Sequence, residues 1–327
     1  MVTRLLAQLR RGGAGPVDVA RVLLLRASLE GDAGQHARAL RSHARALTLL
    51  QPLRRDLDAV RLRVQSRCAA AWIALERGEY GEARAGYRAA LELAGRRLGR
   101  DDADTITALN GLGVVGKYTG QFGRAERYYQ RALAAMQRAD VDLSALATLH
   151  HNLGGLEHAR GRPERGEPHA RRSVELRVRS LGPGHPAVAA DLAALAALLD
   201  AQDKFAEAER LYRRALQIFR RSYGPEHYEL CVTYNNLGAL AHRRGRWRTA
   251  ERLYMRALAM KERLLGKDHP DVAMTLSNLG VLHAEAGRPA DAARAYRRAL
   301  TIFRRHLPRR HPSVQICLEA QAALAAR

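Results

Sequence analysis

The chain has 327 residues, of which 47% are hydrophobic and 5% are aromatic, and it carries a net charge of +22. Its three cysteines lack the spacing of metal ligands, so we expect reduced thiols in a cytoplasmic protein without a zinc site. No stretch approaches the roughly 18 apolar residues of a membrane span, and the apolar run at the start is too short for a signal peptide. We therefore expect neither export nor insertion into a membrane.

The positive charge allows two interpretations. Charge of this size favours contact with polyanions such as nucleic acid. Arginine is also a good helix former, and a GC-rich genome favours its codons, so the charge can instead be compositional. Only four of the 55 basic residues are lysine, and the compositional interpretation is the one we prefer.

A fixed period organises the chain. Four histidines lie 42 residues apart: His185, His227, His269 and His311. Small residues recur at nearly the same interval: Ala90, Ala132, Ser173, Ala215, Ala257 and Ala299. A period in this range indicates stacked units of two short elements each.

In chain order, residues 1–16 are predicted to form a short basic arm or helix, and residues 17–311 an array of two-helix units. We expect the units at about 17–50, 56–98, 103–139, 143–181, 186–223, 228–265 and 270–306. The first of them is degenerate. Residues 312–327 are predicted to form a capping helix, because the last unit would otherwise expose its apolar side.

The stretch 261–300 shows the physics of one unit. Pro270 at the first helical position costs no hydrogen bond, and His269 before it is expected to cap the helix. Gly280 lets the second helix approach closely, and Tyr296 on that helix faces back toward it. Two such helices cannot bury their apolar faces alone, so the units must stack.

The fourth unit departs from this pattern at Pro168, which falls in the second turn of its second helix. Proline there removes a backbone hydrogen bond and clashes with the preceding turn, so we predict a kinked or shortened helix. Two interpretations remain open: a decayed unit without a role, or a hinge that lets the array open around a ligand.

The residues Leu265–Ala273, with the sequence LGKDHPDVA, and Asn235–Gly238, with the sequence NNLG, identify a family. They resemble the tetratricopeptide repeat in its 42-residue kinesin light chain subtype, and we expect a bacterial member. The resemblance implies an all-α fold: an α-solenoid wound as a right-handed superhelix of about seven helix-turn-helix repeats with a capping helix. The tyrosine that this pattern places after Leu-Gly is replaced throughout, for example by Gly116 and His283.

Motifs of catalysis are missing from the sequence, including the phosphate-binding loop, the serine hydrolase elbow and the zinc protease motif. Gly111–Gly116 imitates a dinucleotide-binding loop but falls inside a predicted helix. His151 and His158 would lie about 10 Å apart along a helix, too far to share one metal ion. We therefore expect no enzyme activity, no cofactor and no metal.

The resemblance places the first helix of each repeat on a concave groove. Counting from each Leu-Gly pair predicts the groove residues Asn110, Lys117, Tyr118, His151, Asn152, His158, Asn235, Asn236, His242, Arg243, Ser277 and Asn278. Amide side chains can pair with both N–H and C=O of a peptide backbone, and the resemblance implies that asparagines here clamp an extended peptide. The alternative is that Asn152, Asn236 and Asn278 only bridge adjacent repeats.

We expect a non-enzymatic adaptor that holds an extended segment of a partner protein and acts as a monomer. The cationic groove residues Lys117 and Arg243 and the histidines beside them favour an acidic partner or a free C-terminus. The alternative is a polyanion or nucleic-acid binder that uses arginine pairs of the second helices on the convex face, such as Arg213–Arg214 and Arg297–Arg298.

Overall fold

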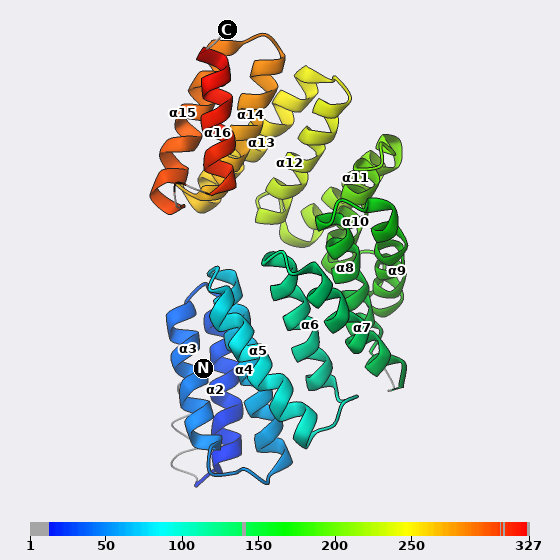
Figure 1. Cartoon of the computed structure of the whole chain (residues 1–327), viewed down its shortest axis with the longest axis vertical. Helices are drawn as coiled ribbons and strands as arrows, with labels where there is room; N and C mark the ends of the chain where they lie inside the picture. The colour runs from blue at the N-terminus through cyan, green and yellow to red at the C-terminus, as the bar shows by residue number, and fades with distance from the viewer. Residues whose placement is uncertain (1–12, 139–141, 308, 310, 326–327) are drawn as a thin grey trace. The chain divides into compact units, whose positions relative to one another are not determined.

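A computed structural model describes residues 13–138, 142–307, 309 and 311–325 (Figure 1). Most of the predicted N-terminal arm, residues 1–12, lies outside the described residues. The described part is entirely helical and contains no strand, which confirms the all-α repeat fold. The helices are α2 (Pro16–Asp32), α3 (His36–Leu50), α4 (Leu57–Glu76), α5 (Tyr80–Arg97), α6 (Ala103–Tyr118), α7 (Phe122–Arg138), α8 (Leu143–Ala159), α9 (Pro163–Leu181), α10 (Pro186–Asp200), α11 (Phe205–Tyr223), α12 (Tyr228–Arg243), α13 (Trp247–Leu265), α14 (Pro270–Glu285), α15 (Pro289–His306) and α16 (Pro312–Ala325).

The chain divides into two compact units, an N-terminal unit of Met1–Gly161 and a C-terminal unit of Arg162–Arg327. In the N-terminal unit, α2 and α3, α4 and α5, and α6 and α7 form antiparallel pairs, and α8 packs on α7 (Figure 1). In the C-terminal unit, α9 packs on α10, three pairs follow from α10 to α15, and α16 packs on the last pair. Each unit is thus a stack of helical hairpins.

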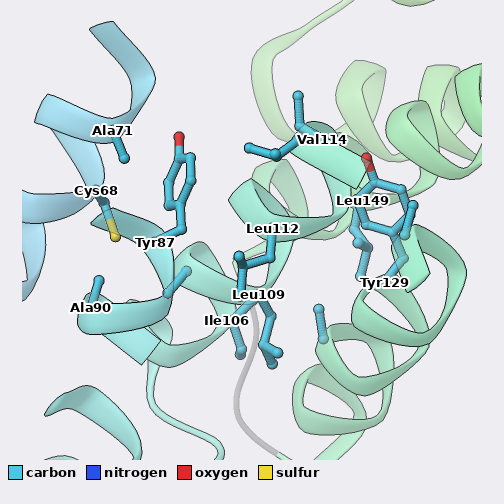
Figure 2. Close-up of a cluster of buried hydrophobic side chains, with 14 of the residues drawn as sticks. Cys68, Ala71, Tyr87, Ala90, Ile106, Leu109, Leu112, Val114, Tyr129 and Leu149 are labelled. Atoms are coloured by element: carbon cyan, nitrogen blue, oxygen red, sulfur yellow. The ribbon is translucent and has the colours of Figure 1, made fainter. Parts of the chain in front are cut away.

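In the third, sixth and seventh repeats, a tyrosine of the second helix packs against a glycine of the first. In the third repeat, a Cβ atom added to Gly113 would lie 2.2 Å from the ring of Tyr129, so only glycine fits. Gly280 and Tyr296 repeat this contact at 2.6 Å in the seventh repeat, as predicted. Figure 2 shows the rings of Tyr87 and Tyr129 among the buried aliphatic side chains of the N-terminal unit.

The predicted histidine caps are confirmed. The Nδ1 atoms of four histidines accept a hydrogen bond from the backbone N–H two residues later, which is one of the donors that a helix start leaves unpaired. They begin four successive first helices of the C-terminal unit: His185, His227, His269 and His311.

We predicted a kinked or shortened helix at Pro168, and the shortening does not occur. Helix α9 runs through this proline for 19 residues, as long as α11 and α13. Pro168 lies on the exposed side near the helix start, so the carbonyl group that loses its partner can bond to water. The flanking Gly166 and Ala170 are buried and hold the helix in place.

No helix in the described ranges is long and apolar enough to cross a membrane. The three cysteines are free and buried. Burial raises the pKa of Cys231 to about 11. A thiol with such a pKa is a poor nucleophile at neutral pH, which fits a packing role for this side chain.

Candidate functional site

The first helices form the more closely packed face of each unit. In the N-terminal unit α2, α4, α6 and α8 contact one another in sequence, and α10, α12, α14 and α16 do so in the C-terminal unit. Within the described residues, second helices contact first helices but not each other. The row whose members approach more closely lies on the inside of the curve, so the first helices provide the concave face of each unit.

An amide pair joins two neighbouring first helices of the N-terminal unit. The Asn152 amide nitrogen on α8 donates to the Asn110 amide oxygen on α6 over 2.8 Å. Both side chains are half-buried. The bond uses one group of each amide, so the nitrogen of Asn110 and the oxygen of Asn152 remain available at the concave face.

The C-terminal unit repeats this pair at the same helix positions. The Asn278 amide nitrogen on α14 donates to the Asn235 amide oxygen on α12 over 3.1 Å. Thr275 supports the same oxygen with a longer contact of 3.4 Å. Asn152 and Asn278 therefore do bridge adjacent repeats, each through one group of its amide.

Asn236 differs from these two asparagines. It lies at the same position of its helix as Asn152 and Asn278, directly before the Leu-Gly pair, and is half-buried. The acceptor position in the preceding repeat is Ala193, which has no acceptor group in its side chain. Among the described residues, the Asn236 amide therefore has no hydrogen-bond partner and both of its groups are open to a ligand.

Lys117 and Tyr118 form a small aromatic and cationic patch at the end of α6. The Lys117 ammonium lies 4.9 Å from the centre of the Tyr118 ring. Burial lowers the pKa of Lys117, which shows that its surroundings are poorly hydrated. Tyr118 is exposed and stacks on Tyr80 of α5 with ring centres 6.2 Å apart.

The other predicted cations already have acidic partners within the chain. Arg243 donates to the carboxylates of Asp200 and Asp203 over 2.8 and 2.6 Å. The His242 Nε2 atom lies 3.0 Å from a carboxylate oxygen of Glu285. These partners link α12 to its neighbouring repeats, so Arg243 and His242 are occupied as inter-repeat contacts.

The remaining predicted groove residues are spread over both units. His151 is half-buried and has interactions within the chain, whereas His158 is exposed on α8. Ser277 accepts a hydrogen bond from the thiol of Cys317 over 3.3 Å. The glycine run Gly111–Gly116 lies inside α6, as expected. No three histidine, cysteine or acidic side chains gather as a metal site in the described ranges.

Arginines of the second helices are exposed on the opposite face, but many are ion-paired. Arg171 bonds to Glu207 of the next repeat over 3.0 Å, and Arg213 bonds to Glu209 one turn before it over 2.6 Å. Arg214 and Arg297 are exposed without an ion pair to any described residue. The convex face is therefore a mixture of neutralised and free arginines.

Sequence reasoning missed a cavity in the N-terminal unit, between α2, α3 and α4. Its lining includes Trp72, His36 and His43. The signal in the sequence is the degeneracy of the first repeat, because His43 occupies a position that is tyrosine in most other repeats.

A sequence profile of the tetratricopeptide repeat matches residues 61–138, 145–221, 195–263 and 229–305. No curated protein matches the chain in sequence. Among solved structures, BtubC (BKLC) from P. vanneervenii is 26% identical, with 71% of this chain and 96% of that chain covered and a TM-score of 0.58.

Two further solved structures share the fold. A putative kinesin light chain from Podosopora anserina is 17% identical, with 61% of this chain and 95% of that chain covered and a TM-score of 0.52. A Rap protein complexed with competence and sporulation factor is 12% identical, with 94% and 88% covered and a TM-score of 0.66. The prediction of tetratricopeptide repeats is confirmed, and the kinesin light chain structure shares their fold.

Proposed function

The chain belongs to the tetratricopeptide repeat family, and we propose that it is a non-enzymatic adaptor that holds an extended peptide segment of a partner on the concave face of its first helices. The repeats make it a protein-interaction scaffold. The Rap protein of the same fold was solved with a bound factor, so a stack of this kind can hold a ligand.

The observation that carries this proposal is the presence of open amide groups on the first helices of each unit. Asn236 has no partner among the described residues, and Asn110 and Asn152 each use only one of their groups on the other. An extended peptide presents N–H and C=O groups that pair with such amides in both directions. Half-buried amides bind more strongly than exposed ones, because less water competes for them.

The preferred partner carries an acidic side chain or a free C-terminus near Lys117 and His158. These two residues lie on α6 and α8, about two helical turns after Asn110 and Asn152. Arg243 and His242 were predicted for the same role, but their carboxylate partners already neutralise them. The acidic preference is therefore assigned to the N-terminal unit.

Selection from a random peptide display library, followed by titration of the selected peptides, tests this function. Asn236→Ala should weaken selected peptides about tenfold or more without changing thermal stability, because the side chain has no structural partner to lose. Asn278→Ala is the matched control, since it breaks a bond within the protein and should cost about 1 kcal/mol of stability. Peptides that bind equally to parent and Asn236→Ala would contradict the assignment.

A second candidate is polyanion binding through the convex face, favoured by the exposed free arginines Arg214 and Arg297 and the net charge of +22. Such binding depends on counterion release, so affinity for a duplex oligonucleotide should fall by orders of magnitude between about 50 and 200 mM salt. Replacing both arginines by glutamate should abolish it, and the Asn236→Ala variant should leave it unchanged.

A further inference from the structure

The cavity of the N-terminal unit has a volume of about 720 Å³, which is large enough for an aromatic ring and the groups attached to it. It lies between α2, α3 and α4. Aliphatic side chains such as Leu24 and Ile73 line one part, and polar groups line the rest. Sites with this mixed lining usually bind an apolar group and orient it by a few polar contacts.

The repeat pattern explains why the cavity exists. A tyrosine stands nine residues after the turn position in five repeats, and each is at most 5% exposed: Tyr87, Tyr129, Tyr212, Tyr254 and Tyr296. In the first repeat this position is His43, nine residues after Gly34. A smaller ring therefore occupies the space that tyrosine fills elsewhere.

The opposite wall of the cavity shows the same departure. Tyr87 lies against Gly111, where an added Cβ atom would come within 2.2 Å of its ring. The residue equivalent to Gly111 in the preceding repeat is Ala69. His43 and Ala69 both line the cavity. The cavity therefore corresponds to the space that a tyrosine ring fills in most other repeats, and here this space is open toward the surface.

Polar groups around the opening indicate the chemistry of the occupant. The Nδ1 atom of His36 is buried without a hydrogen-bond partner in the described part of the chain, and His43 is held by Ser66 at 3.1 Å. Glu76 is the only acidic residue of the lining and makes no ion pair with any described residue. Trp72 lies one turn before it and is 48% exposed, which offers a face for a cation.

We propose that this cavity binds an aromatic side chain of a partner peptide that carries a basic group beside the ring. The ring takes the open tyrosine position between His43 and Ala69, and the cation lies against Glu76 and Trp72. Residues 1–12 of the chain contain no aromatic residue and cannot supply this ring themselves. The proposal adds an anchor to the proposed function, but its test does not depend on the groove asparagines.

Three small ring compounds test it: tyramine, p-cresol and 4-hydroxyphenylacetate, which share a phenol and differ in charge. Trp72 and Trp247 are the two tryptophans, so a Trp247→Phe background makes Trp72 fluorescence the readout. Tyramine should bind roughly fivefold more tightly than p-cresol, and 4-hydroxyphenylacetate most weakly. Glu76→Gln should remove the difference between the first two.

A double variant, His43→Tyr with Ala69→Gly, restores the family pattern and fills the cavity from within. It should raise the melting temperature of the N-terminal unit and weaken tyramine at least tenfold, so loss of binding cannot be attributed to unfolding. Ala85→Gly, an exposed alanine on α5, is the matched control and should not affect binding. Unchanged binding to the double variant, or no saturable response to any ring, would overturn the proposal.

Equal affinity for all three compounds would overturn the assignment of a basic neighbour. Asn236→Ala should leave the ring titrations unchanged. If the ring compounds do not bind but peptide binding still depends on Asn236, only the cavity proposal is rejected. If the ring compounds bind but peptide binding does not depend on Asn236, only the groove proposal is rejected.

Discussion

The two units begin their first helices with different side chains that make the same bond. In the N-terminal unit Asp56, Asp102 and Asp142 accept from a backbone N–H at the helix start. In the C-terminal unit histidine Nδ1 atoms take that place, as at His269 with 3.2 Å. A carboxylate suits the positive helix end, whereas an imidazole can accept only through an unprotonated nitrogen. Apart from α2, which begins after Gly15 without a side-chain cap, the first helices therefore share an acceptor at this position rather than one residue type.

The units also differ at a buried position of the second helices. In the N-terminal unit it is apolar, as at Ala94 and Met136. In the C-terminal unit charged and aromatic residues alternate there: Arg177, Phe219, Lys261 and Phe303. Lys261 is satisfied by the Asp271 carbonyl oxygen at 3.2 Å and the Thr275 hydroxyl at 3.1 Å. A polar group is thus accepted at this position only where the next helix offers acceptors.

Placing a buried charge at the equivalent position of the N-terminal unit should have the largest effect on stability. Met136→Lys places an ammonium among apolar side chains of the N-terminal unit, and we expect it to lose at least about 3 kcal/mol of stability. Amide hydrogen exchange of α6 and α7 measures this loss locally. Met136→Leu is the control, with an expected cost below about 1.5 kcal/mol. A small loss of stability in Met136→Lys would show that the hydrogen-bond acceptors around Lys261 are not needed to accommodate a buried charge.

Removing the buried charge of Lys261 should have the opposite effect and stabilise the protein. Burial lowers the pKa of Lys261 in the folded protein. Between the folded and the unfolded pKa values, the unfolded chain therefore binds more protons than the folded one. The free energy of unfolding rises with pH across that window. Below the window the burial penalty is complete. Lys261→Met should therefore stabilise the C-terminal unit by about 1 kcal/mol at pH 7, with a gain that shrinks as the pH approaches 10. Denaturation at pH 7 and pH 10 measures it, and a gain independent of pH would contradict this cause.

Replacing the residues that cap the first helices should have the smallest effects on stability. Asp102→Ala and His269→Ala should each cost about 1 kcal/mol at pH 7, seen as faster amide exchange at the starts of α6 and α14. His269→Asp should keep the start of α14 as protected as in the parent protein, because a carboxylate accepts the same hydrogen bond. Loss of protection in His269→Asp would show that the imidazole itself, and not only an acceptor, is required at this position.

Most of the fold could be predicted because it depends on local chemistry repeated along the chain. The 42-residue interval, the cap at His269 and the close approach at Gly280 each follow from residues a few positions apart. The effect of Pro168 could not, because it depends on which side of α9 faces water. A proline on the exposed side loses one hydrogen bond to solvent, whereas the same residue on the packed side would disrupt the helix.

The candidate site shows the same limit more clearly. The sequence by itself determined the repeat, the row of first-helix asparagines and the glycine–tyrosine contacts, because these recur at fixed intervals. Only the tertiary structure decided that Asn278 bonds to Asn235 while Asn236 has no partner among the described residues, that Asp200 and Asp203 occupy Arg243, and that a cavity lies beside His43. The amide pair and the contacts of Arg243 depend on partners about 40 residues away in a neighbouring repeat. One altered residue in that repeat, such as Ala193, changes whether a side chain is bonded within the protein or open to a ligand.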